Sequence, residues 1–145
     1  IIRPAGFQRI KAMRIKNFIL ELCNRFHCDL GELDKLKDEE LRSFLVGIKG
    51  IGRETADNIM LYAFGRLVFP VDNYTRRFLM RLGYPEIKGY EELRRWIEER
   101  LEPDIYTYRE FRALIVKHCK STCKAKPRCN MCPLRRLCRY FKEHT

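Results

Sequence analysis

The stretch from Leu45 to Ala56 decides the fold and reads LVGIKGIGRETA. Apolar residues at helical spacing lie on both sides of it, and the run Gly50-Ile51-Gly52 interrupts the pattern between them. Glycine adopts positive φ angles without a steric penalty, and it lets the backbone approach a ligand closely because it has no Cβ. The stretch therefore predicts two helices joined by a tight hairpin, with the Ile51 side chain tucked inward.

This hairpin has the features of a phosphate-binding turn. The first N–H groups of a helix have no partner within the helix and lie at the positive end of its dipole, which suits an anion. A plain turn between packed helices is the alternative, and the Gly-x-Gly pattern alone supports it about as well. The net charge of the chain, +11, favours phosphate binding. The residues expected to contact the phosphate-bearing partner are Lys49, Gly50, Ile51, Gly52, Arg53 and Thr55.

The composition indicates a globular protein that binds a polyanion. Lys and Arg number 30 against 19 Asp and Glu, so nucleic acid is the first candidate partner and an anionic membrane surface the second. No stretch is long and apolar enough to span a bilayer, so we expect no membrane insertion. The opening residues Ile1 to Pro4 show no signal-peptide pattern, and the absence of an initial Met suggests a piece of a longer protein.

Helical spacing of apolar residues runs through the whole chain without a convincing alternating strand, so we expect an all-α fold. The expected helices cover residues 7–26, about 38 to the glycine at 47, 53–64, 73–82, 90–101 and 105–117. Asp38 suits the N-cap of the second helix. Cys23 and Cys28, on the first helix or just after it, are read as core residues. The apolar stripe of that first helix consists of Ile10, Met13, Ile15, Phe18, Ile19 and Leu22.

Four cysteines near the end of the chain, Cys123, Cys129, Cys132 and Cys138, have the spacing C-x5-C-x2-C-x5-C. The loop is rich in lysine, arginine and proline and cannot hold a shape by burial, whereas four thiolates around one metal centre can. A zinc ribbon usually has two separated Cys-x2-Cys pairs, so this compact loop favours a cubane cluster. Seven cysteines, five of them between Cys119 and Cys138, favour a reduced intracellular protein over a secreted disulfide scaffold.

Three motifs, taken in this order, resemble the endonuclease III superfamily of DNA glycosylases. Leu45–Ala56 is similar to its helix-hairpin-helix, Val71–Arg77 to its aspartate segment, and the four cysteines to its iron–sulfur loop. The start of the barrel helix in that family is matched by Gly6-Phe7, Lys11-Ala12 and Ile15. Within the superfamily, the stretch GIGRETAD resembles the subgroup called 3-methyladenine DNA glycosylase III.

The resemblance implies a division of the chain into two lobes. Residues 1–83 would form a helical barrel segment that contains the hairpin at about 38–65 and the aspartate segment at 71–77. Residues 84–145 would form a C-terminal lobe closed by the cluster loop at 123–138. The N-terminal helices of the full protein, with part of the substrate pocket, are expected to precede this chain.

Asp72 has two readings. It begins a helix, so the residues alone favour an N-cap role. The resemblance instead places it at the catalytic aspartate of the family. Cleavage of an N-glycosidic bond builds positive charge on the deoxyribose, and a fixed carboxylate stabilises that charge and can orient or deprotonate water. The resemblance thus implies a DNA glycosylase of base-excision repair acting on a flipped damaged base.

The residue at position 54 distinguishes a monofunctional from a bifunctional glycosylase. Bifunctional members of the family carry a nucleophilic lysine just after the hairpin, which forms a Schiff base and cuts the strand. Glu54 occupies that position here, and a carboxylate cannot do this chemistry. The expected enzyme is monofunctional and acts on an alkylated purine such as 3-methyladenine. The alternatives are a bifunctional glycosylase/AP lyase acting on oxidised pyrimidines and a non-catalytic DNA-binding module; a zinc-dependent nucleic-acid adaptor is a third.

The resemblance also implies that Cys123, Cys129, Cys132 and Cys138 bind a structural [4Fe–4S] cluster. One departure stands out, because the first gap in the family is usually six residues and here it is five. Cys119 is the rival first ligand, but its gap of nine fits less well, so we read it as a buried thiol. The expected protein is a monomer that binds damaged double-stranded DNA in the cytoplasm or nucleoid of a prokaryote.

Overall fold

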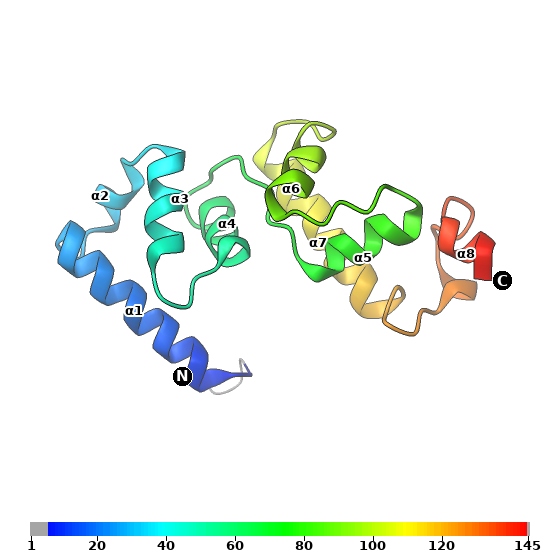
Figure 1. Ribbon diagram of the computed structural model, residues 1–145, viewed down its shortest axis with the longest axis horizontal. Coiled ribbons are helices and arrows are strands. Elements are labelled where there is room, and N and C mark those ends of the chain that lie inside the picture. The colour runs from blue at the N-terminus through cyan, green and yellow to red at the C-terminus, as the bar shows by residue number, and fades with distance from the viewer. Residues whose placement is uncertain (1–5, 145) are drawn as a thin grey trace. The chain divides into compact units, whose positions relative to one another are not determined.

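The computed structural model describes residues 6–144, and among these it contains helices and loops but no strand (Figure 1). The opening stretch Ile1 to Pro4, considered above, lies outside the described residues. The all-α prediction is confirmed. In chain order the helices are α1 (Gln8–Phe26), α2 (Leu30–Asp34), α3 (Asp38–Gly47), α4 (Arg53–Tyr62), α5 (Asn73–Leu82), α6 (Tyr90–Glu98), α7 (Ile105–Ser121), the 3-10 turn η2 (Cys129–Met131) and α8 (Arg139–His144).

The six helices expected from the sequence are all present, whereas α2 and α8 were not expected. Both are short, with five and six residues, so neither is long enough to show a helical period. The N-cap assignment of Asp38 is wrong by one residue. Lys37 is the N-cap of α3, and the Glu40 carboxylate accepts its backbone N–H at 3.0 Å. Asp38 instead pairs with Arg66 at 3.1 Å.

The chain forms two compact units, which we describe separately. The first ends at Arg66 and contains α1 to α4, with α3 packed on α4 and α1 on α2. The second begins at Leu67 and contains α5 to α8, with α5 packed on both α7 and α8. Through this packing of α5, residues 67–83 belong to the second unit. The fully buried side chains include Leu33, Leu41, Leu45 and Leu61 in the first unit and Phe69 and Ile115 in the second.

The end of α1 corrects the reading of two cysteines. Cys23 and Cys28 are not core residues; they form a disulfide, and Cys28 is exposed. His27 and Cys28 both have positive φ angles, 52° and 62°, which turn the chain back toward the last turn of α1. This disulfide also departs from the reduced chain that the cysteine count predicted.

The apolar stripe of α1 is only partly buried. Leu22 is 6% exposed, whereas Ile10, Met13, Ile15 and Ile19 are each about half exposed. Even so, within residues 6–144 no helix combines the length and the apolar character that a membrane-spanning segment requires.

Candidate active site, hairpin and cysteine pocket

The glycine hairpin has the predicted form. Gly50 has a φ of +97°, and the Ile51 side chain is buried at 6% exposure between α3 and α4. A hydrogen bond from Ile51 N to Ile48 O at 2.9 Å closes the turn. Asn17 on α1 donates to Lys49 O at 2.9 Å, so α1 braces the hairpin from one side. The inward position of Ile51, expected from the sequence, is confirmed.

The N-terminus of α4 follows directly after the hairpin turn. Gly52 is the N-cap, with a φ of −87°, and no side chain caps this end of the helix. Lys49, Gly52 and Arg53 are exposed, as a phosphate contact requires. Thr55 is half-buried and lines an apolar groove of the first unit together with Ile51. The turn therefore presents exposed positive charge and an uncapped helix N-terminus, while its isoleucine acts as an anchor.

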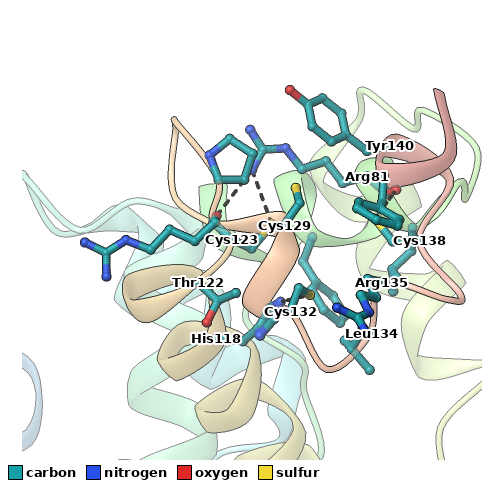
Figure 2. Close-up of a pocket in the computed structure, with 15 residues that line it drawn as sticks. Arg81, His118, Thr122, Cys123, Cys129, Cys132, Leu134, Arg135, Cys138 and Tyr140 are labelled. Carbon is teal, nitrogen blue, oxygen red and sulfur yellow. Dashed lines mark hydrogen bonds between the residues drawn. The ribbon is translucent and has the colours of Figure 1, made fainter. Parts of the chain in front are cut away.

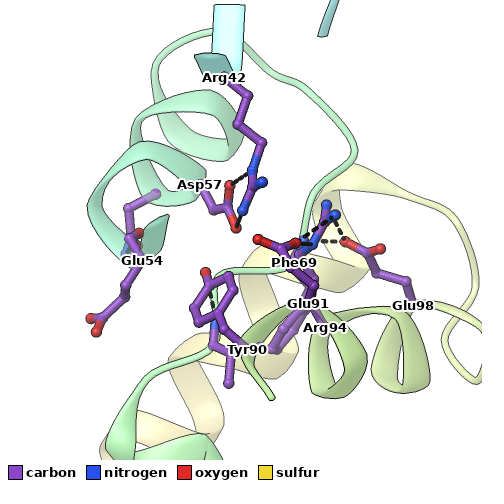
Figure 3. Close-up of polar contacts among 10 residues, drawn as sticks. Arg42, Glu54, Asp57, Phe69, Tyr90, Glu91, Arg94 and Glu98 are labelled. Atoms are coloured by element: carbon purple, nitrogen blue, oxygen red, sulfur yellow. Dashed lines mark hydrogen bonds and ion pairs between the residues drawn. The ribbon is translucent and has the colours of Figure 1, made fainter. Parts of the chain in front are cut away.

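A buried ion pair that the sequence did not reveal holds the two helices of the hairpin together (Figure 3). Asp57 on α4 is completely buried, and Arg42 on α3 donates to it from Nε at 2.6 Å and from Nη2 at 3.1 Å. Burying a carboxylate is costly unless it is paired and hydrogen-bonded. The bidentate contact with Arg42 supplies both the opposite charge and the hydrogen bonds, and it links the two helices that the turn joins.

The segment before Asp72 is buried although it has no regular structure. Val68, Phe69 and Val71 are at most 3% exposed, and buried N–H groups need partners. Glu98 on α6 accepts the N–H of Phe69 at 2.8 Å, and the Tyr90 hydroxyl accepts the N–H of Val71 at 3.3 Å (Figure 3). Pro70 has no N–H to satisfy. Side chains of α6 thus fix the backbone of the irregular segment that leads into Asp72.

Asp72 is the N-cap of α5, and both of its carboxylate oxygens have donors. Oδ1 accepts from the backbone N of Thr75 at 2.7 Å and from its hydroxyl at 2.9 Å. Oδ2 accepts from Arg112 Nη2 on α7 at 3.3 Å. The Asp72 side chain is 10% exposed. The carboxylate is thus fixed in orientation and paired with a cation. No local sequence pattern indicated Arg112, which is 40 residues away from Asp72 in the chain.

The four C-terminal cysteines line one pocket (Figure 2). Cys123 follows α7, Cys129 begins η2, Cys132 follows it, and Cys138 precedes α8. Arg81 on α5 donates to Cys123 Sγ at 3.2 Å. No group of three or more candidate ligands within residues 6–144 is arranged to hold a single metal ion. In a cubane cluster each thiolate binds a different iron, so the sulfurs are spread more widely than around one ion.

Cys119 does not line this pocket, although its side chain interacts with that of Cys123. It is 1% exposed on α7, and its Sγ donates to Tyr74 O at 3.6 Å. Burial raises the pKa of its thiol to about 11. A buried thiol that resists ionisation is a poor metal ligand, because the thiolate is the ligating form. Cys123, and not Cys119, lines the pocket with the other three cysteines.

Two arginines of α5 hold the start of the cysteine loop. Arg77 donates from Nε to Cys123 O at 3.0 Å. Arg81 donates to Lys124 O at 2.6 Å and to Ala125 O at 3.0 Å. Its guanidinium also lies over the Tyr140 ring at 4.8 Å from the centroid. One helix, α5, therefore begins at the Asp72 carboxylate and supports the cysteine loop from its later turns.

Comparison with known proteins gives one consistent group of relatives. No family model matches the chain. MJ1434 of Methanocaldococcus jannaschii, named as a candidate DNA repair glycosylase, is 43% identical over 142 residues, covering 95% of this chain and 64% of that protein. Endonuclease III of Sulfolobus acidocaldarius is 33% identical over 145 residues, covering 99% and 62%. The chain thus spans 62–64% of the length of these two relatives.

Solved structures agree with these relatives. A non-covalent endonuclease III–DNA complex matches with a TM-score of 0.73 and 27% identity over 98% of this chain and 63% of that one. The H. pylori 3-methyladenine DNA glycosylase MagIII, bound to 1,N6-ethenoadenine, matches with a TM-score of 0.55 and 26% identity over 99% of this chain and 56% of that one. Both solved structures are therefore similar in fold to this chain over nearly its whole length.

Proposed function

We propose that this chain, a homologue of the endonuclease III superfamily of helix-hairpin-helix DNA glycosylases in both sequence and fold, carries the catalytic carboxylate and the main DNA contacts of a base-excision glycosylase. Its substrate is duplex DNA with a damaged base, which is flipped out of the stack before the N-glycosidic bond is hydrolysed. The observation that carries the proposal is the fixed and nearly buried Asp72 carboxylate at the start of α5.

Asp72 stabilises the positive charge that develops on the deoxyribose as the base departs. Its oxygens are already oriented by Thr75 and Arg112, so little reorganisation is needed during the reaction. The same carboxylate orients or deprotonates the attacking water. A side chain that served only as an N-cap would need one oxygen, whereas here a donor outside the capped helix engages the second.

The hairpin supplies a grip on the DNA backbone that does not depend on sequence. Lys49 and Arg53 are exposed on either side of the turn, and the uncapped N-terminus of α4 favours a phosphate. The cysteine loop adds a second basic surface, with Arg135 and Arg136 between its last two cysteines. Each of these two surfaces binds backbone phosphates of the DNA.

The enzyme is monofunctional and removes an alkylated purine such as 3-methyladenine. Glu54 supports the first point, because it occupies the position of the lysine nucleophile in bifunctional relatives and offers no amine. The likeness to MagIII supports the second, since that glycosylase is bound to a modified adenine. A bifunctional enzyme acting on oxidised pyrimidines is the second candidate, favoured by the higher TM-score to the endonuclease III complex.

Cys123, Cys129, Cys132 and Cys138 hold a [4Fe–4S] cluster. The fit rests on the shared pocket of these four thiols, with Arg81 donating to one sulfur. The cluster when bound supplies cross-linking of a loop that has little core of its own. The residues of the loop then present lysine and arginine to DNA.

The test is release of a damaged base. Duplex oligonucleotides carrying 3-methyladenine, 1,N6-ethenoadenine or thymine glycol are incubated with the protein, and free base and abasic sites are measured. Asp72→Asn should keep duplex affinity yet lose about 10²- to 10⁴-fold in release rate. Asp104→Asn is the matched control, because Asp104 caps α7 in the same way, accepting from Thr107 N at 2.7 Å.

If Asp72→Asn and Asp104→Asn both lower the rate of base release by the same small factor, Asp72 acts only as an N-cap. Tight duplex binding without release from any substrate, by the full-length protein, would favour the non-catalytic DNA-binding module. Release of thymine glycol with strand cleavage would favour the bifunctional candidate instead.

A further inference from the structure

We propose that Arg112 is a positioning residue for Asp72: it holds the second carboxylate oxygen and so sets the orientation from which the carboxylate acts on the sugar. The inference rests on the proposed function of Asp72. Arg112 Nη2 lies 3.3 Å from Asp72 Oδ2, and the two side chains are 16% and 10% exposed. The pair is thus largely withdrawn from solvent, where a charge-assisted hydrogen bond is stronger than at the surface.

Thr75 restrains the Asp72 carboxylate through one oxygen only. Its backbone N–H and its hydroxyl both donate to Oδ1, at 2.7 Å and 2.9 Å. Rotation about the Cβ–Cγ bond moves both oxygens together, and this terminal torsion has broad minima, so each further contact narrows the range of orientations. The Arg112 contact to Oδ2 supplies the second fixed point. Positioning errors of about 1 Å cost on the order of 10²-fold in rate, so a second fixed point has a measurable catalytic value.

Helix α7 is itself anchored on both sides of this contact. Upstream of the aspartate, the ring of Phe69 packs against Phe111 at 6.0 Å between centroids. Downstream of it, Cys119 Sγ donates to Tyr74 O at 3.6 Å. The arginine therefore projects from a helix that is held by the residues just before and just after the carboxylate. A surface arginine that met the aspartate by chance would lack this support.

The sign of the charge separates positioning from direct catalysis. The sugar becomes cationic as the base leaves, so a guanidinium in direct contact with it would oppose the reaction. Paired with the carboxylate, the same guanidinium instead holds the orientation of the group that stabilises the sugar. Arg112 therefore acts through Asp72 and not on the substrate.

The experiment is a double-mutant cycle on single-turnover base release. Arg112→Gln keeps a donor and removes the charge, while Arg112→Lys keeps the charge on a single nitrogen. Each is made in the wild-type chain and together with Asp72→Asn, and duplex affinity is measured in parallel. Lys117→Met is the control for loss of one exposed positive charge from α7.

We expect Arg112→Gln to lower the rate about 10- to 100-fold with affinity within about 3-fold of wild type. Arg112→Lys should lie between Gln and wild type, since Arg and Lys are not interchangeable at a geometrically defined contact. In the Asp72→Asn background, Arg112→Gln should change the residual rate less than about 3-fold, because residues that act as a unit are not additive. Lys117→Met should keep the wild-type rate.

Other outcomes overturn the inference. A merely structural ion pair predicts a lower unfolding midpoint with a normal rate for the folded fraction. A direct phosphate contact predicts weaker binding and effects that add to those of Asp72→Asn. If Arg112→Gln does not fold, Arg112→Lys decides, and a wild-type rate in that variant rejects the proposal. If the wild-type protein releases no base at all, the proposed function fails. If the wild-type protein is active and the Arg112 variants release base at the same rate, the inference about Arg112 fails and the proposed function stands.

Discussion

Asp57 is completely buried on α4, and Arg42 on α3 donates to both of its carboxylate oxygens, at 2.6 Å and 3.1 Å. The glycine hairpin joins these two helices. The pair therefore sets the spacing of α3 and α4 just behind the turn that we propose binds DNA. It makes the geometry of the hairpin depend on a tertiary contact as well as on its glycines.

Asp57→Asn should lower the free energy of unfolding of the protein by about 2–3 kcal/mol. This is below the usual cost of breaking a fully buried pair, because Arg42 is 21% exposed and can recover some hydration. Chemical denaturation followed by circular dichroism measures the change. Glu32→Gln is the control, since it removes an exposed ion pair with Lys35 in the same unit and should leave the midpoint unchanged. Equal midpoints for the two variants would contradict the structural role of the pair.

Gly50→Ala should destabilise the hairpin, whereas Gly52→Ala should be tolerated. At Gly50 the φ of +97° is strained for any L-residue, and a Cβ would lie 2.8 Å from Arg14 Cγ. The left-handed conformation alone costs about 1–2 kcal/mol. At Gly52 the φ is −87°, and a Cβ would meet nothing within 4 Å. Thermal unfolding of both variants checks this difference, and the reverse order of stability would mean that the turn is built differently.

Lys49→Glu and Arg53→Glu should weaken binding to damaged and undamaged duplexes alike. Both residues are exposed beside the hairpin, and phosphate contacts carry no sequence information. Each lost contact should reduce the slope of log affinity against log salt by about 0.9. Fluorescence anisotropy over a range of salt concentrations measures this slope. Lys88→Glu is the control, because it makes the same charge change at another exposed lysine. A slope that stays the same would place the DNA elsewhere on the protein.

Wild-type protein should release base without cutting the strand, and borohydride should trap no covalent adduct with DNA. The reason is Glu54, which offers no amine for a Schiff base. Denaturing gels of labelled duplex report both outcomes. Glu54→Lys restores an amine at that position, so an adduct in this variant alone would assign the difference to residue 54. A strong adduct with the wild-type chain would mean that another lysine is the nucleophile.

The purified protein should be yellow-brown and contain about four iron atoms per chain. Cys129→Ser and Cys132→Ser should each lose colour and iron, because both thiols line the pocket. Cys119→Ala should keep both, since Cys119 lies outside the pocket. Absorption spectroscopy and metal analysis decide the matter. A colourless native protein with one stoichiometric zinc would support the adaptor reading instead.

The features that the sequence predicted well are local ones. The hairpin and the start of α5 at Asp72 each depend on residues a few positions apart, and glycine and an N-cap carboxylate leave recognisable patterns at that range. Cys23 and Cys28 were misread because their pairing depends on a backbone turn that residue spacing does not show. Apolar helical context favoured a core role, but two positive φ angles at His27 and Cys28 turn the chain, and spacing does not reveal them.

The sequence by itself determined the all-α class, the hairpin and the order of the motifs, because these follow from periodicity and from the backbone preferences of single residues. Only the tertiary structure decided the partners of the charged groups. Arg42 meets Asp57 across 15 residues, Arg112 meets Asp72 across 40, and Arg81 meets Cys123 across 42. Such contacts arise when packed helices bring distant side chains together, and among the 30 lysines and arginines of this chain no local pattern marks which ones will be paired.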